Sequence, residues 1–219
     1  KRLKNKNLLE LGGKPLINWS IEAAVDSEHI DQVVVSSDDK EILAISKKFN
    51  VKIINRPKAL AGDKSDMFSV VKHVLSKYNG TYKYIVLCQP TSPLRNSNDI
   101  DDAFKTLIVK KADAVISVSE TIKNPMWSAQ ISKNLDMSNF VKKIKHSKRS
   151  QDLPQFFTPN GAIYICKIDS LLLSKTFYVD KNIYAHIMPK HRSIDIDDQF
   201  DFLFAESLIN HQNFLNNEL

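Results

Sequence analysis

Long apolar runs and targeting segments are absent from this sequence of 219 residues. No run approaches the roughly 18 apolar residues that a membrane helix needs, and the basic N-terminal residues are not followed by an apolar stretch. We therefore expect neither a membrane anchor nor a signal peptide in this chain. The expected location is the cytoplasm, with no membrane partner.

Cysteine is also scarce. Cys88 and Cys166 are far apart, and each closes an apolar, strand-like run. This placement predicts small buried hydrophobic side chains in a reducing compartment and disfavours a disulfide or a catalytic thiol. The hydrophobic content of 42% is that of a globular core, so we expect a single domain, residues 1–219, with an excursion.

Positive charge gathers in two clusters, residues 1–6 and 142–149, within a net charge of +6. Each cluster fits a solvated face, a nucleic-acid contact, or a site for a small polyanion such as a triphosphate or a sugar carboxylate. Nucleic-acid binding predicts aromatic residues among the basic ones. The first cluster has none and the second has only His146, so we expect no nucleic-acid partner.

Five short runs are apolar at nearly every position, which is typical of strands buried on both faces. The segments between them carry apolar residues at helical spacing, as in Ile17, Ile21, Ala24 and Val25. Alternating strands and helices predict an α/β fold with a parallel sheet covered on both sides, whose ligands bind beyond the carboxyl ends of the strands. The runs are Val33–Val35, Val51–Ile54, Tyr84–Leu87, Ala114–Val118 and Ala162–Ile165.

Two further helical stripes and a final helix complete the pattern. The expected apolar face of the final helix contains Phe200, Leu203, Phe204 and Leu208, and Asp197 or Asp198 is expected to cap its start. The two other stripes are Phe68, Val71, Leu75 and Tyr78, and Ile100, Phe104, Leu107 and Ile108.

Residues 121–157 do not follow this alternation of strand-like and helical segments. They contain two prolines and a charged middle, yet Met126, Trp127 and Ile131 make the segment too apolar for a disordered loop. A subdomain or an arm that packs on another subunit fits better.

Asp195 and Asp197 stand two apart in an Ile-Asp-Ile-Asp alternation. On a strand, both carboxylates would project to one face while Ile194 and Ile196 turn to the core. Two convergent carboxylates suit a hard divalent cation such as Mg²⁺. Taken alone, however, the segment favours a solvated strand edge followed by a helix cap.

Two other segments are ambiguous when taken alone. The basic run Lys1–Asn7 suits phosphate binding, but it also fits a ragged terminus. The run Gln89–Arg95 follows an expected strand, and its two prolines would hold Gln89 and Thr91 at defined positions. Taken alone, an ordinary strand-to-helix loop is the favoured explanation.

Taken together, Lys1–Asn7, Gln89–Arg95, Pro159–Ile165 and Ser193–Asp197 resemble the CMP-sialic acid synthetase family in identity and order. The resemblance covers essentially the whole chain. It implies a Rossmann-like, three-layer nucleotidyltransferase fold with a mainly parallel sheet. It also implies a reaction in which the anomeric hydroxyl of a 2-keto-3-deoxy sugar acid attacks the α-phosphate of CTP, giving a CMP-sugar and pyrophosphate.

The resemblance also implies roles for individual residues. The triphosphate would lie against Lys1 and Lys6 with Asn7 near the ribose, and the cytosine would lie near Arg56 and Ser65. Gln89, Asn160 and Tyr164 would bind the acidic keto sugar. Asp195 and Asp197 would hold Mg²⁺, or Mn²⁺ in its place, and together with Lys6 they would form the catalytic group. Which group accepts the proton of the sugar hydroxyl stays open.

Members of this family are homodimers in which an arm reaches the partner, and residues 121–157 occupy the matching place. The resemblance also leads us to expect an N-terminal strand and the first half of the phosphate loop upstream of Lys1. Thr158 stands where sialic acid specialists carry an arginine, which leaves the keto sugar open among N-acetylneuraminate, legionaminate and related acids. A nucleotidyltransferase for another sugar or a sugar 1-phosphate is the alternative enzyme, and a basic nucleic-acid-binding module is the alternative outside enzymes.

Overall fold

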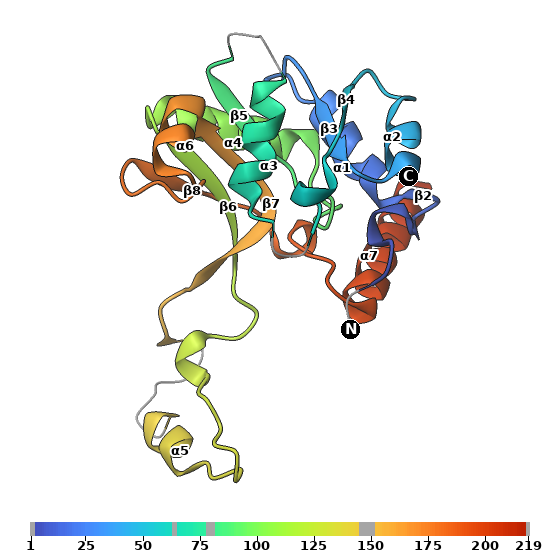
Figure 1. Cartoon of the computed structure of the whole chain (residues 1–219). Helices are drawn as coiled ribbons and strands as arrows, with labels where there is room; N and C mark the ends of the chain where they lie inside the picture. Colours follow the sequence, from blue (N-terminus) through green and yellow to red (C-terminus); the bar gives the residue numbers. More distant parts are fainter. Residues whose placement is uncertain (1–2, 63–64, 78–81, 145–151, 218–219) are drawn as a thin grey trace.

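The computed structural model describes residues 3–62, 65–77, 82–144 and 152–217. The α/β architecture is confirmed, and all five predicted strands are present (Figure 1). The strands are β1 (Glu10–Leu11), β2 (Lys14–Pro15), β3 (Val34–Ser37), β4 (Lys52–Asn55), β5 (Tyr84–Leu87), β6 (Ala114–Glu120), β7 (Phe157–Lys167) and β8 (Ile183–Ile187). The α-helices are α1 (Leu16–Val25), α2 (Lys40–Ser46), α3 (Met67–Ser76), α4 (Ser97–Val109), α5 (Ser138–Ile144), α6 (Ile168–Ser174) and α7 (Gln199–Asn217). Short 3₁₀ turns are η1 (Lys6–Leu8), η2 (Lys58–Leu60), η3 (Pro125–Trp127) and η5 (Lys190–Arg192).

The central sheet has the order β5-β7-β6-β8 and is mixed. β6 and β8 pair in parallel, whereas β7 runs antiparallel to both β5 and β6. Three of the four strands therefore share one direction, and β7, which contains the predicted run Ala162–Ile165, is the reversed one. β3 and β4 form a separate parallel pair, and β1 and β2 a short antiparallel hairpin.

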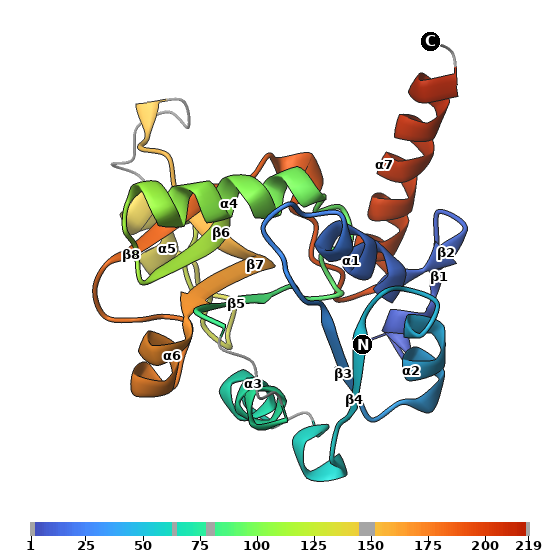
Figure 2. The ribbon, with the colours of Figure 1, turned by 90° about the horizontal axis from the view of Figure 1, so that it is seen from above.

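Helices cover both faces of the central sheet, which gives three layers (Figure 2). On one face, Ala24 of α1 and Ile100 and Leu107 of α4 pack on Val115 and Ile163 of the sheet. On the other face, the buried cluster contains Val71 of α3, Leu171 of α6 and the sheet residues Ala114 and Cys166. Successive strand residues thus enter opposite cores, as the fully apolar runs predict.

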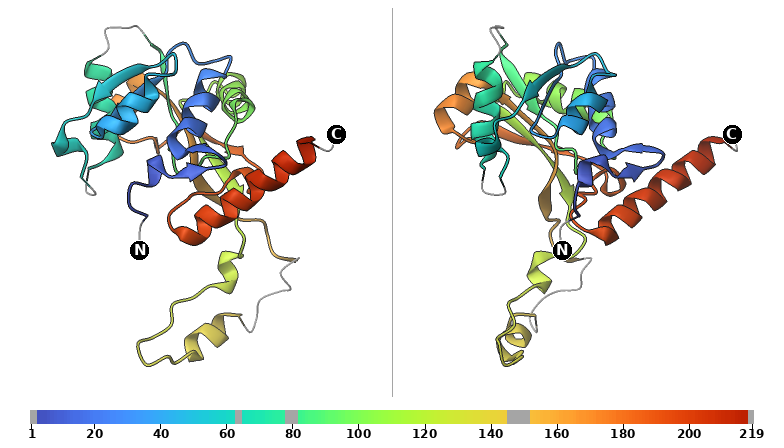
Figure 3. Two further views of the ribbon diagram at one scale, coloured as in Figure 1. Left: turned by 90° about the vertical axis from the view of Figure 1, so that its right-hand side faces the viewer. Right: turned by 45° about the vertical axis from the view of Figure 1, so that its right-hand side comes forward.

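The last helix packs on a different face from the predicted one. Phe202, Ala205 and Ile209 of α7 are buried with Leu11 and Leu16, next to the β1-β2 hairpin. The predicted face is open: Phe200 is 82% exposed, Leu203 51% and Phe204 54%. α7 carries apolar residues on several sides, and the hairpin selects the one that is buried. Figure 3 shows the end of α7 projecting from the body.

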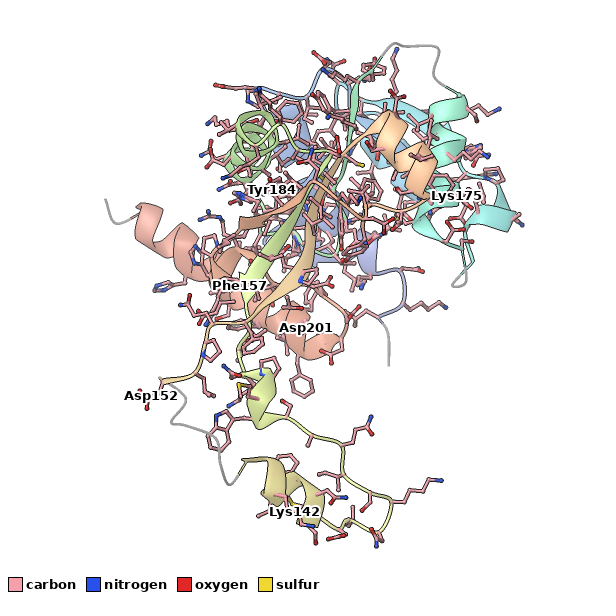
Figure 4. The ribbon with its side chains drawn as sticks, turned by 90° about the vertical axis from the view of Figure 1, so that its left-hand side faces the viewer. Lys142, Asp152, Phe157, Lys175, Tyr184 and Asp201 are labelled. Carbon is pink, nitrogen blue, oxygen red and sulfur yellow. The ribbon has the colours of Figure 1, made fainter. Side chains whose placement is uncertain are left out.

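Between β6 and β7 the described residues 121–144 and 152–156 leave the body as an arm that contains η3 and α5. The arm extends far from the sheet in Figure 3, and Figure 4 places Lys142 near its far end and Phe157 near its base. Its apolar side chains are exposed, among them Trp127 at 39% and Ile131 at 53%. The basic cluster predicted at residues 142–149 falls largely outside the described residues.

Both cysteines are unpaired, as predicted. Among the described residues, no helix has the length and apolar content needed to cross a bilayer.

Candidate functional site

A pocket of about 460 Å³ opens beyond the carboxyl end of β5, where the sheet rule places ligands. It brings together five residues that the sequence predicts for the site, from three distant segments of the chain: Lys6, Asn7, Gln89, Asp195 and Asp197. The lining residues are Asn5, Lys6, Asn7, Leu8, Asp39, Ile42, Met67, Gln89, Pro90, Thr91, Asp195 and Asp197.

The two aspartates lie on a loop, not on the predicted strand. Ile196 is fully buried between them, and its amide donates to the carbonyl oxygen of Thr91 at 2.7 Å. The Asp201 carboxylate accepts from the amides of Asp197 and Asp198 at 2.9 and 3.0 Å. The alternation therefore has its predicted consequence, isoleucine inward and aspartate outward, although no ladder holds it.

Asp198 caps α7, as predicted, by accepting from the amides of Phe200 and Asp201 at 2.8 and 3.1 Å. Asp195 and Asp197 are thus followed at once by a fixed helix start.

The charge on Asp195 is disfavoured. Desolvation is the largest cause that raises the pKa of this carboxyl, and the nearby negative charge of Asp197 adds to it. A hydrogen bond from Thr91 and the charge of Lys6 act in the opposite direction. A cation placed between the two aspartates would stabilise both charged carboxylates and so offset these two effects.

Lys6 is the cation that the structure itself places beside this loop. Its Nζ donates to the carbonyl oxygen of Ile196 and lies 3.4 Å from Oδ1 of Asp197. The Lys6 side chain is 17% exposed, whereas that of Asp197 is 74% exposed. Asn7 follows in the same turn and lines the pocket. Lys1 lies outside the described residues.

The donor set of the loop fits a magnesium ion. Mg²⁺ is commonly held by one or two carboxylates while water and phosphate oxygens complete the octahedron. Asp195 and Asp197 supply two carboxylates in one open pocket. No group of three or more acidic, histidine or cysteine side chains suited to a metal occurs among the described residues, so further ligands would come from water or from a bound nucleotide.

A second pocket of about 280 Å³ adjoins the first, and both are lined by Met67 and Gln89. It contains Tyr164, predicted for sugar binding, whose ring lies 5.8 Å from Phe177 and 6.2 Å from Tyr178. Burial, and then the hydrogen bond with Tyr178, raise the pKa of the Tyr164 phenol. The lining residues are Asp66, Met67, Phe68, Leu87, Gln89, Tyr164, Lys175, Thr176, Phe177 and Tyr178.

Asn160, also predicted for sugar binding, lines neither pocket. Its side chain is buried, with Oδ1 accepting from Ser117 Oγ at 2.6 Å and Nδ2 donating to Ser193 Oγ at 2.9 Å. Nδ2 also lies 3.3 Å from Met188 Sδ. The amide group is thus engaged within the protein, and it ties β7 to the start of the aspartate loop.

Arg56 and Ser65, predicted for the cytosine, are not brought to the first pocket. Arg56 donates to Ser36 at the end of β3, and burial lowers the pKa of its guanidinium. Ser65 Oγ donates to the carbonyl oxygen of Ala59 at 3.4 Å. Their role in base binding stays a prediction.

Asp39 and Met67 line the pocket but were missed by sequence reasoning. Asp39 had a usable signal, because it follows a predicted strand, and it caps α2 by accepting from Glu41 N at 2.8 Å. Thr91 lay within the recognised proline-rich segment. Met67, at the start of α3, had no distinguishing signal.

Comparisons with known proteins agree on one class. A family model described as cytidylyltransferase matches residues 1–213. The N-acylneuraminate cytidylyltransferase of Escherichia coli O18:K1:H7 is 36% identical over 216 residues, which cover 97% of this chain and 50% of that protein. This chain therefore spans about half the length of that relative. The CMP-N,N'-diacetyllegionaminic acid synthase of Legionella pneumophila is 32% identical, covering 95% of this chain and 91% of that protein.

A solved structure of a CMP:2-keto-3-deoxy-manno-octonic acid synthetase complexed with CTP has a TM-score of 0.70 to this chain. It is 16% identical, and the match covers 97% of this chain and 94% of the other. At this identity the likeness concerns the fold alone.

Proposed function

This chain belongs to the cytidylyltransferase family, and on that premise we propose that it transfers the CMP group of CTP to a nonulosonic acid, a sialic acid-like 2-keto-3-deoxy sugar. The anomeric oxygen of the sugar forms a bond to the α-phosphorus, the bond to the pyrophosphate group breaks, and a proton is released. The observation that carries this proposal is the junction of two pockets at Gln89 and Met67.

The first pocket suits a nucleotide triphosphate. Lys6 offers a cation beside the aspartate loop, and phosphoryl transfer asks a protein mainly to position its reactants and to neutralise charge on the phosphate oxygens. Asn7 lies next to Lys6 on the same wall. The proposal includes contacts of Lys1 with the triphosphate and of Arg56 and Ser65 with the cytosine.

The second pocket suits the sugar acid. Tyr164 and Tyr178 offer hydroxyl groups on an aromatic wall, and Gln89, on the boundary, offers an amide to a bound sugar. The two reactants would then meet beside Gln89, with Asp195 close by across Gly161.

We propose Mg²⁺, with Mn²⁺ as a substitute, as the cofactor held by Asp195 and Asp197. When bound, the ion would supply Lewis-acid neutralisation of charge on the phosphate oxygens. The Thr91 contact to Ile196 holds the loop so that both carboxylates face the pocket. Asp195→Asn or Asp197→Asn with wild-type turnover at saturating Mg²⁺ would remove that residue from the mechanism.

A substrate panel tests the reaction. Pyrophosphate release from CTP by the full-length protein is measured with N-acetylneuraminate, legionaminate and pseudaminate, and in parallel with sugar 1-phosphates. We expect release with at least one nonulosonic acid and none with the sugar 1-phosphates. Release with sugar 1-phosphates alone would favour the other nucleotidyltransferase class, and salt-dependent retention of DNA or RNA would favour a nucleic-acid-binding module.

We further propose a cytoplasmic homodimer held by the arm, residues 121–157. The support is the exposed apolar surface that the arm presents, including Met126 at 41% and Ile131 at 53%. Ile131→Glu is expected to shift the protein toward monomer in analytical ultracentrifugation. Leu173→Glu, which changes an 87% exposed residue of α6, is the control and should leave the mass unchanged. Equal masses for both variants and the wild type would contradict the arm's role.

A further inference from the structure

Arg95 is one of the largest fully buried side chains in the protein, with 2% of its surface exposed. It closes the proline-rich segment that begins at Gln89. No carboxylate forms an ion pair with it among the described residues, and its Nε and Nη2 atoms have no protein acceptor there. Burying a guanidinium in this way is costly, so the residue needs a reason beyond filling the core.

The remaining guanidinium nitrogen of Arg95, Nη1, contacts three backbone carbonyl oxygens. Nη1 lies 3.2 Å from the oxygen of Gln89, 3.1 Å from that of Ser92 and 2.9 Å from that of Ala162. Two of these oxygens belong to the turn between the pockets, and the third belongs to β7. The guanidinium therefore clamps the turn onto the strand.

The β7 carbonyl is available because the strand bulges there. The register between β6 and β7 shifts between Ile116 and Val118, and Gly161 has φ +73°. Ser117 Oγ fills part of the break by accepting from the amide of Ile163 at 2.8 Å. Bulges of this kind re-aim side chains near active sites. Arg95 satisfies the carbonyl that the bulge leaves free.

The Gln89–Ser92 turn and β7, the two segments that Arg95 joins, both contact residues of the candidate site. Thr91, inside the turn, accepts from the amide of Ile196 between the two aspartates. Gly161, next to Ala162, is so close to Gln89 Oε1 and Asp195 Oδ2 that a Cβ at this position would lie 2.8 and 3.5 Å from them. A shift of the turn against β7 would therefore move Gln89 and the aspartate loop relative to each other.

We propose that Arg95 is a positioning residue for cytidylyl transfer: its buried guanidinium locks the Gln89–Ser92 turn onto the β7 bulge and so fixes Gln89 and Thr91 relative to Asp195. The inference rests on the proposed function for its catalytic consequence, whereas the locking itself is a property of the fold. Arg95 does not line either pocket, so it acts through the backbone that it holds.

The test compares Arg95→Met and Arg95→Lys with Lys167→Met in the full-length protein. Lys167 is the last residue of β7, the strand that Arg95 contacts, and it pairs with Asp113 at 2.6 Å, so Lys167→Met also removes a long cation beside this strand but leaves the contacts of the bulge in place. Two properties are measured at equal temperatures below each midpoint of unfolding: amide hydrogen exchange, and the kcat and KM for CTP and the sugar acid.

For Arg95→Met we expect exchange in residues 91–95 and 160–163 to speed up by about tenfold or more, with α4 unchanged. We expect kcat to fall by about 10- to 100-fold, because a misplacement of about 1 Å costs this much. The KM for CTP should change by less than roughly threefold, since the lysine side of the nucleotide pocket is untouched. Arg95→Lys should fall between, because it keeps a cation but its shorter, flexible chain does not hold the ammonium at the position that the planar guanidinium fixes for Nη1.

Unchanged exchange in both segments, a wild-type kcat, or the same changes in Lys167→Met would overturn the proposal. If Arg95→Met does not fold, Arg95→Lys is judged by the same criteria. A wild-type protein that transfers no cytidylyl group refutes the proposed function instead, and the exchange comparison still decides whether Arg95 locks the turn.

Discussion

Substituting Gly161 by alanine tests whether Gln89 must lie at its observed position, because the effect of backbone strain can be measured separately in a control variant. Its φ of +73° is a left-handed conformation that costs a residue with a side chain about 1–2 kcal/mol. An alanine Cβ would also lie 2.8 Å from Gln89 Oε1 and 3.3 Å from Ser92 Oγ, so one of these groups must move. The end of the Gln89 side chain is the one that yields most easily.

Gly13, in the β1-β2 turn, provides the matched control. Its φ is +84°, yet an added Cβ would meet nothing within 4 Å. Gly13→Ala therefore carries the backbone cost alone, whereas Gly161→Ala carries the backbone cost and the collision. Urea unfolding should show a loss of about 1–2 kcal/mol for Gly13→Ala and a loss at least as large for Gly161→Ala.

Activity should separate the two variants. Gly161→Ala should lower kcat/KM for the sugar acid by about 10- to 100-fold, because Gln89 is displaced from the boundary between the pockets. Gly13→Ala should keep wild-type kinetics. The reasoning is refuted if Gly161→Ala retains wild-type kcat/KM, or if Gly13→Ala loses as much activity as Gly161→Ala.

Three other changes have defined outcomes. Arg192→Met removes the bidentate partner of Asp99, whose side chain is only 4% exposed. Breaking such a buried pair is strongly destabilising, but the Arg192 side chain is 29% exposed, so we expect the free energy of unfolding in urea to fall by about 2–3 kcal/mol. Lys105→Met, which breaks an exposed pair on the same α4, should cost less than about 1 kcal/mol, and equal losses would contradict this ranking. The folded state raises the pKa of Asp195, so the free energy of unfolding falls as the pH rises from the unfolded pKa through the folded one. Asp195→Asn should therefore be more stable than the wild type at pH 7 in EDTA. A less stable variant would contradict the raised pKa. Lys6→Met should lower kcat/KM for CTP by about 10- to 100-fold in steady-state assays, whereas unchanged kinetics would remove Lys6 from the phosphate site.

The strands were predictable because burial on both faces leaves an uninterrupted apolar run, and Tyr84–Leu87 has the predicted bounds. The direction of β7 was not. An apolar run such as Ala162–Ile165 carries no sign of the direction of its neighbours, which is set by the long connection through the arm. For α7, several faces carry apolar residues, and only the tertiary contact with Leu11 and Leu16 selects Phe202 and Ile209 for burial.

The aspartates of the site were predictable from their alternation with isoleucine, taken together with the family resemblance. Asp195 and Asp197 reach the pocket as expected, because Ile196 between them is drawn into the core. The arrangement of Asn160 and Arg95 was not predictable, since each is held by backbone and side-chain groups of a bulge that leaves no periodic trace in the sequence. Their polar groups serve the fold around the site, and sequence alone does not distinguish that use from ligand contact.

Under the proposed function, a nucleotide pocket and a sugar-acid pocket meet at Gln89 for cytidylyl transfer. Phosphorus NMR of CTP, a nonulosonic acid, Mg²⁺ and the full-length protein follows this transfer. We predict that the triphosphate signals give way to one phosphodiester signal and pyrophosphate in equal amounts, and that the change requires the sugar acid. Formation of CDP and orthophosphate, or a coupled pair of diphosphate signals that appears only with a sugar 1-phosphate, would contradict it.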